Sequence, residues 1–169
     1  MKVFISGSIS IKDLPQPAIQ KIDNIINKKY VILIGDAGGV DFNVQKYLLE
    51  KKYANVVVYF VGGKARNNIG SWETMKVTEG VGNKRGRELY TVKDIAMAKD
   101  SNYGLMIWDG KSRGTLNNIR EMKKAGKRFL VVLDEKIIDG KDIDGMINIQ
   151  NKQIKKAKLQ PLLFQMAFS

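Results

Sequence analysis

Short apolar runs alternate with amphipathic segments along the first 133 residues of the chain. Five runs are predicted to be strands, and they occupy residues 3–6, 30–34, 56–60, 103–108 and 128–133. Several of them are apolar without interruption, as expected of parallel strands that are covered on both faces. The pattern therefore predicts an α/β protein with a Rossmann-like, open, mostly parallel sheet and helices on both faces.

The segments between the strands carry apolar residues at helical spacing. The first helix is expected to start near Pro15 or Pro17, because proline suits the first turn of a helix. The other helices are predicted over residues 42–52, 89–99 and 114–125. Asp41 is placed to cap the second of these segments, and Gly126 is placed to end the last one.

Two stretches break the alternation. Residues 62–88 show no periodicity, so we expect an irregular functional loop there, in which Trp72 could stack on a base. Residues 134–169 follow the last predicted strand and end in an apolar segment, 162–168. We therefore expect a nucleotide-binding domain over residues 1–133 and a C-terminal extension over 134–169 that packs on this domain or on a dimer partner.

The composition excludes several kinds of chemistry. The 169 residues include no cysteine and no histidine. This rules out disulfides, thiol nucleophiles, Ser–His catalysis and metal sites built on thiolate or imidazole, and we expect neither a cofactor nor a metal. Acid–base chemistry would fall to carboxylates, lysines or tyrosines. No apolar run is long enough to span a bilayer, so we expect a cytoplasmic protein with no membrane partner.

The formal net charge of the chain is +12, with basic residues scattered along its whole length. Such a charge suits general solubility and the attraction of an anionic small molecule about equally well. A basic domain is also typical of nucleic-acid binding, but the chain has no block of five basic residues. A nucleic-acid partner is therefore an alternative that the scatter of charge does not favour.

Glycine-bearing turns follow three of the predicted strands. A strand, a tight glycine turn and a helix start together gather backbone N–H groups around an anion. Because the carboxyl ends of parallel strands meet at one edge of a sheet, we expect a phosphate-bearing ligand at that edge. The candidate ligand-binding residues are Gly7, Ser8, Gly35, Gly38, Gly39, Asp41, Gly110, Ser112, Arg113, Gly114 and Thr115.

Carboxylates near the same strand ends are candidates for chemistry. Asp36, Asp94 and Asp109 are the candidate catalytic carboxylates, with Asp41 close by. A carboxylate at a sheet edge could bind a ribose hydroxyl or act as a glycosidic nucleophile. The plainer interpretation is that Asp41 caps a helix, Asp109 belongs to a turn and Asp94 is a surface charge.

The chain resembles the SLOG superfamily in two places. Residues 35–41 (GDAGGVD) resemble the GGA-x-G-[VI]-D turn of that group, and residues 94–115 resemble its helix–strand–GG-x-GT unit. The group consists of Rossmann-like proteins and includes the DprA DNA-processing proteins, the YspA-type proteins and the LOG phosphoribohydrolases. The resemblance covers residues 1–133 and implies a site for a nucleotide or nucleotide derivative at the strand ends.

The resemblance to the LOG enzymes is incomplete where their chemistry takes place. Those enzymes use a glutamate three residues after the threonine of this unit to hydrolyse the N-glycosidic bond of a nucleoside monophosphate. The matching residue here is Asn118, and an amide cannot act as a general base. The family arginine has no clear match, since Lys93 and Asp94 lie near its place. A binding or sensing protein and a weak nucleotide N-glycosidase are both consistent with this pattern.

Further alternatives come from related groups. Residues 5–9 (ISGSI) resemble the start of the nucleoside 2-deoxyribosyltransferase-like hydrolases, whose carboxylates act at comparable strand ends. That resemblance keeps N-glycoside hydrolysis open despite Asn118, and the DprA branch keeps nucleic-acid binding open. LOG proteins pair through helices beside their active site, so the resemblance also implies a homodimer.

Overall fold

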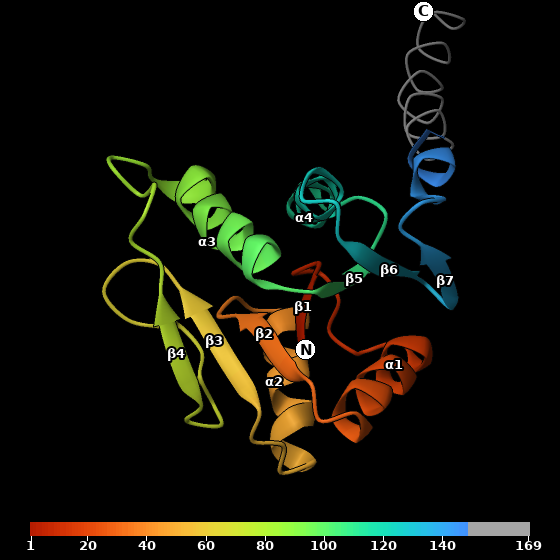
Figure 1. Cartoon of the computed structure of the whole chain (residues 1–169), viewed down its shortest axis with the longest axis horizontal. Helices are drawn as coiled ribbons and strands as arrows, with labels where there is room; N and C mark the ends of the chain where they lie inside the picture. The colour runs from red at the N-terminus through yellow and green to blue at the C-terminus, as the bar shows by residue number, and fades with distance from the viewer. Residues whose placement is uncertain (149–169) are drawn as a thin grey trace, which may run out of the picture.

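The computed structural model describes residues 1–148, which form one seven-stranded sheet between two layers of helices (Figure 1). The strands lie in the order β4-β3-β2-β1-β5-β6-β7, and all neighbours are parallel except β6 and β7. The strands are β1 (Lys2–Gly7), β2 (Val31–Gly35), β3 (Val56–Phe60), β4 (Glu73–Lys76), β5 (Tyr103–Trp108), β6 (Arg128–Leu133) and β7 (Lys136–Asp139). The predicted fold class is confirmed.

The apolar strands are buried on both faces because each one supplies side chains to two separate cores. Phe4 packs with one core cluster and its neighbour Ile5 with the other, and both are fully buried. This alternation follows from the strand geometry, in which successive side chains point to opposite faces. It explains why the central strands show an unbroken apolar run.

Helices cover both faces of the sheet (Figure 1), and a helical run over residues 143–148 follows β7. On one face lie α1 (Gln16–Asn27) and α2 (Val40–Glu50), which bury Ile22 and Val44 in the core. On the other face lie α3 (Gly86–Asp100) and α4 (Arg113–Lys124), which bury Met97 and Ile119. The expected start of α1 is confirmed, because Pro15 is its N-cap residue and Pro17 lies in its first turn.

Two local predictions were wrong. Asp41 does not cap α2, because the helix begins one residue earlier, at Val40, with Gly39 as its N-cap residue. Residues 62–88 are not wholly irregular, because β4 pairs with β3 within this stretch and α3 already begins at Gly86. All four residues of β4 are exposed, so the strand has no apolar pattern that would predict it.

The chain continues in the same sheet beyond Leu133. A tight turn at Asp134, where φ is 52°, reverses the chain so that β7 pairs antiparallel with β6. Ile143, further along, is buried in the core. The apolar segment 162–168 lies outside the described residues. Within residues 1–148, no helix is long and apolar enough to cross a membrane.

Candidate functional site

The three predicted glycine turns meet at the carboxyl ends of β1, β2 and β5. Strand β1 lies between β2 and β5, and the chain runs outward in opposite directions from this point, which is where open α/β sheets bind ligands. The first two turns are joined by a hydrogen bond from the Val40 N–H to the Ser8 carbonyl, at 3.3 Å. Gly39 has a φ of +64°, and a Cβ there would overlap the backbone of Ile9. Glycine is therefore required for the two turns to approach so closely.

Ser8 and Asp109 join the first turn to the third. The Ser8 Oγ lies 3.1 Å from Thr115 Oγ1 and accepts a hydrogen bond from the Asp109 N–H at 3.1 Å. The Asp109 carboxylate accepts hydrogen bonds from the Ser10 hydroxyl at 2.6 Å and from the Ser112 N–H at 2.7 Å. Burial alone would raise the pKa of Asp109, but these hydrogen bonds lower it below its usual value. Asp109 is thus an ionised carboxylate that holds a turn.

Several N–H groups of the predicted phosphate cradle already have partners within the chain. In the second turn, the Ala37 N–H donates to Asp41 Oδ2 at 3.2 Å. In the third, the Lys111 N–H donates to Asp109 at 2.9 Å, and the Thr115 N–H donates to Ser112 Oγ at 3.5 Å. A phosphate at these turns would have to exchange with bonds that the protein makes itself. The fold brings the three turns together as predicted, but several of their N–H donors already bond to side chains of the protein.

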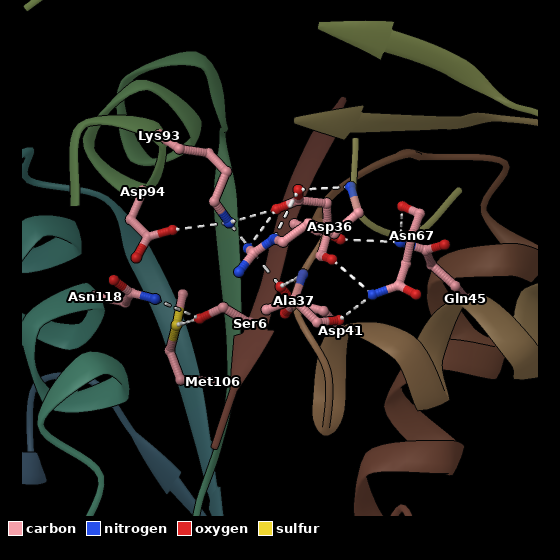
Figure 2. A network of polar contacts seen from close by, with 12 residues as sticks. Ser6, Asp36, Ala37, Asp41, Gln45, Asn67, Lys93, Asp94, Met106 and Asn118 are labelled. Carbon is pink, nitrogen blue, oxygen red and sulfur yellow. Dashed lines mark hydrogen bonds and ion pairs between the residues drawn. The ribbon is translucent and has the colours of Figure 1, made fainter. Parts of the chain in front are cut away.

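A buried lysine stands behind the second turn and is surrounded by carboxylates (Figure 2). Lys93 of α3 is 3% exposed, and its Nζ lies 3.2 Å from Asp94 Oδ1 and 4.0 Å from both Asp36 Oδ1 and Asp41 Oδ2. A Cβ at Gly35 would overlap Lys93 Nζ and the Asp41 carboxylate. The carboxylates can approach the lysine because Gly35 has no side chain to separate them. We call Lys93, Asp36, Asp41 and Asp94 the Lys93 cluster.

Burial sets the ionisation of this cluster. Burial raises the pKa of Asp41 to about 6, against an opposing contribution from Lys93. Burial would also raise the pKa of Asp36, but hydrogen bonds from Arg66 and the charge of Lys93 lower it below its usual value. Burial would lower the pKa of Lys93, but the negative charges of the three carboxylates outweigh this effect and raise the pKa above its usual value. Lys93 is therefore charged, and the raised pKa of Asp41 brings its titration close to neutral pH.

Arg66 ties the 62–88 segment to this cluster. Its Nη2 donates to Asp36 Oδ1 at 2.7 Å, and its Nε and backbone N–H both donate to Asp36 Oδ2 at 3.0 Å. The guanidinium lies 4.2 Å from the ring centroid of Tyr90, close enough for a cation–π contact. Together with Arg66, the fully ionised cluster carries two positive and three negative charges. Its own charge therefore does not attract a phosphate.

Asn118 lies beside the cluster and is 5% exposed. Its amide contacts Ser6 Oγ at 3.0 Å (Figure 2), and in the orientation that satisfies both of its atoms it donates to Asp94 Oδ2 at 3.0 Å. The structure thus brings Asn118, Asp94, Asp36 and Asp41 together, whereas Asp109 belongs to the neighbouring turn.

Sequence reasoning did not assign the two cations, Lys93 and Arg66, to this site. Lys93 lies one helical turn from Leu89 and one from Met97, so it interrupts the apolar face of a helix. That position alone could have predicted a buried lysine. Arg66 lies in a segment without periodicity and gave no such signal. Base stacking by Trp72 was the wrong expectation, because its indole N–H donates to the Tyr53 carbonyl at 2.8 Å and its ring packs on the core.

Comparison with known proteins supports the fold. No protein-family model matches the chain, and no curated protein matches it in sequence. Among solved structures, the fold is similar to that of DNA processing protein A from Helicobacter pylori, which was described for its single-stranded DNA binding mode. The TM-score is 0.60 at 18% sequence identity, over 92% of this chain and 81% of the other. This likeness supports the predicted Rossmann-like fold.

Proposed function

We propose that the protein binds single-stranded nucleic acid across the loops at the carboxyl edge of the sheet. The observation that carries this proposal is the charge of these loops. Parallel strands send all their following loops to one edge. On the loops that follow β1 to β5 and on the first turns of α3 and α4, the exposed basic residues number eight against three exposed acidic residues, and the turn after β6 adds the exposed Asp134 and Glu135 at the far end of this edge. The eight are Lys12, Lys64, Arg66, Lys84, Arg85, Arg87, Lys111 and Arg113. We call them the basic rim.

The position of the basic rim favours an extended polyanion over a single enclosed phosphate. The polar groups at the centre of this edge hydrogen-bond largely to one another. The side chains of the basic rim are exposed, including that of Arg66, which also pairs with Asp36. Phe42, in the first turn of α2, is 37% exposed, and Tyr90, at the start of the second turn of α3, is 38% exposed. Basic side chains interspersed with exposed aromatic rings are the usual means of binding single strands without sequence preference.

The fold likeness adds support from an independent direction. DNA processing protein A, which shares this fold at 18% identity, binds single-stranded DNA. A fold alone does not carry a function, so the likeness counts only together with the charge of this chain. Both point to nucleic acid, and the net charge of +12 agrees with them.

The salt dependence of binding tests this proposal. The affinity of the full chain for a labelled long oligothymidylate is measured by fluorescence anisotropy over a range of salt concentrations. The rim variant changes Lys64, Lys111 and Arg113 to Gln, and the control variant changes Lys46, Lys52 and Lys99 to Gln. All six residues are exposed, so both variants lose the same charge from the surface.

Each lost phosphate contact should reduce the slope of log affinity against log salt by about 0.7. The rim variant should therefore bind more weakly, with a slope lower by about 2 if each side chain contacts one phosphate. The control variant should keep the slope of the unchanged protein. Equal behaviour of the two variants, or no binding by the unchanged protein, would reject the rim as the interface.

A nucleotide-derived phosphate ligand at the same edge is the second candidate, with weak N-glycosidase activity as its extension. The pKa of about 6 at Asp41 favours it, because a carboxyl group that titrates near neutral pH suits general acid–base catalysis. Asp36 and Asp94 would be the accompanying carboxylates. The ligand would lie against Gly38 and the start of α4.

Two variants test this second candidate. A side chain at Gly114 meets only Ser112 Oγ, at 3.8 Å, so Gly114→Val should fold and yet block a ligand at the start of α4. Unchanged nucleotide affinity in that variant would exclude the site. Because Asn118 replaces a carboxylate, release of adenine from adenosine monophosphate, followed by chromatography, should be absent or very slow. Fast release would assign the chemistry to the aspartates instead.

A further inference from the structure

We propose that a groove at the opposite, amino-terminal edge of the sheet is a second binding site for single-stranded nucleic acid. This inference rests on the proposed function, since it assigns the same class of partner to a separate surface. The groove has a volume of about 900 Å³ and lies between α1 and the first residues of β5 and β6. Its basic residues are Lys21, Lys28, Lys123, Lys127, Arg128 and Lys141. We call it the amino-edge groove.

The connection after β6 leaves this groove open. In the regular pattern of the fold, a helix follows each strand and covers the sheet, but here a tight turn leads from β6 directly into β7. Within residues 1–148, α1 and α2 are therefore the helices on that face (Figure 1). Ile137 of β7 lies opposite Val132, whose side chain belongs to the core on that face, and Ile137 is 41% exposed. The face near β7 is incompletely covered.

The charge of the groove selects a polyanion. Six basic residues line it, and Asp139 is the acidic residue among its lining. Lys123 pairs with Asp144, which leaves five basic side chains around the opening for which the described residues provide no such pair. The C-terminal residues 149–169 carry four lysines and no acidic residue, so their charge does not complement the groove. A chain of phosphates has the negative charge that complements it.

The floor of the groove suits bases. Ile25 and Leu130 are partly exposed there and lie over the buried Val3 and Leu105, and the partly exposed rings of Tyr30 and Tyr103 stand on either side of the start of β1. Base stacking on such rings contributes about 1–3 kcal/mol per base. Apolar and aromatic area below, with a basic border above, matches a single strand whose bases turn inward and whose phosphates turn outward.

The groove and the basic rim are separate sites. They lie at opposite ends of the strands, and a six-residue strand such as β1 is about 20 Å long. A short oligonucleotide can therefore occupy one site without reaching the other. The full chain should bind two molecules of hexathymidylate, one at each edge.

Titration calorimetry with hexathymidylate at low salt tests this arrangement. The groove variant changes Lys21, Lys28 and Lys127 to Gln and is compared with the unchanged protein, the rim variant and the control variant described above. We expect two hexamers per chain for the unchanged protein and for the control. We expect one hexamer per chain for the groove variant and one for the rim variant. Tyr103→Leu should weaken the groove site at least fivefold and leave the rim site unchanged.

The other outcomes separate this inference from the proposed function. One hexamer per chain that the groove variant retains and the rim variant loses would overturn the groove and leave the rim standing. One hexamer that the rim variant retains and the groove variant loses would overturn the rim and support the groove. No binding would overturn both. If a polyglutamate peptide displaces the groove-bound hexamer as readily as free oligothymidylate does, the groove recognises charge alone and the assignment to nucleic acid is overturned.

Discussion

Replacing Asp41 with Asn should stabilise the protein at neutral pH. Asp41 is buried, and burial raises its pKa from 3.8 to about 6. At pH 7 the folded protein therefore holds an ionised carboxylate in a place that favours the neutral form. Asparagine resembles the protonated form and keeps an oxygen that can accept the hydrogen bond from the Ala37 N–H. The substitution removes the cost of ionisation and keeps the local bond.

The sign and size of the effect follow from the two pKa values. Because the folded pKa lies above the unfolded one, the folded protein binds more protons between pH 3.8 and about 6. The free energy of unfolding contributed by Asp41 therefore falls as the pH rises through this window and stays low above it. The gap corresponds to roughly 3 kcal/mol at most. This value already includes the attraction between Lys93 and the ionised carboxylate. The amide NH₂ of asparagine is not identical to a carboxyl OH, so the net gain should be smaller, about 1–2 kcal/mol.

Urea unfolding at pH 4 and at pH 7.5 measures this difference. The variant and the unchanged protein should have similar free energies of unfolding at pH 4, and the variant should be more stable at pH 7.5. Asp36→Asn is the matched control with the opposite sign, because the lowered pKa of Asp36 means that its ionised form stabilises the fold at neutral pH. A difference between Asp41→Asn and the unchanged protein that is the same at both pH values would refute the reasoning.

Three further predictions concern the stability of the fold. Lys93→Met should reduce the free energy of unfolding by about 3–5 kcal/mol, because it leaves buried carboxylates without their cation, whereas the exposed Lys99→Met should change it little. Gly39→Ala should lower the melting temperature through a loss of 1 kcal/mol or more, while Gly38→Ala, where a Cβ meets open space, should not. Trp72→Phe should cost about 1 kcal/mol in urea unfolding through its lost hydrogen bond, without changing affinity for oligothymidylate.

The sequence was sufficient for the layers of the fold because those depend on local patterns. The runs in β1, β2, β3, β5 and β6 are apolar because both faces of these strands are buried, and the amphipathic segments between them are the four helices. The three glycine turns were placed correctly for the same reason, since each follows such a strand. Where the pattern was local and periodic, the prediction was confirmed.

The errors arose where tertiary contacts decide the structure. The residues of β4 are all exposed, so this strand exists through its pairing with β3 alone. The sequence position of Asp41 predicts a helix cap, but in the structure its carboxylate lies near Lys93, which is 52 residues further along the chain. Arg66 meets Asp36 across 30 residues of chain. Sequence spacing carries no sign of such pairs.

The polar network at the carboxyl edge gives the basic rim a fixed support. Arg66 is 41% exposed on its side chain, yet three hydrogen bonds hold it to a carboxylate that is 1% exposed. Asn67, the next residue, donates to the Asp36 carbonyl at 2.8 Å, and Gln45 of α2 donates to the Asn67 carbonyl at 3.2 Å. A segment held at so many points loses little further conformational freedom when a ligand binds. The buried carboxylates therefore serve binding by fixing the loops that carry the exposed charge, although their own charge repels phosphate.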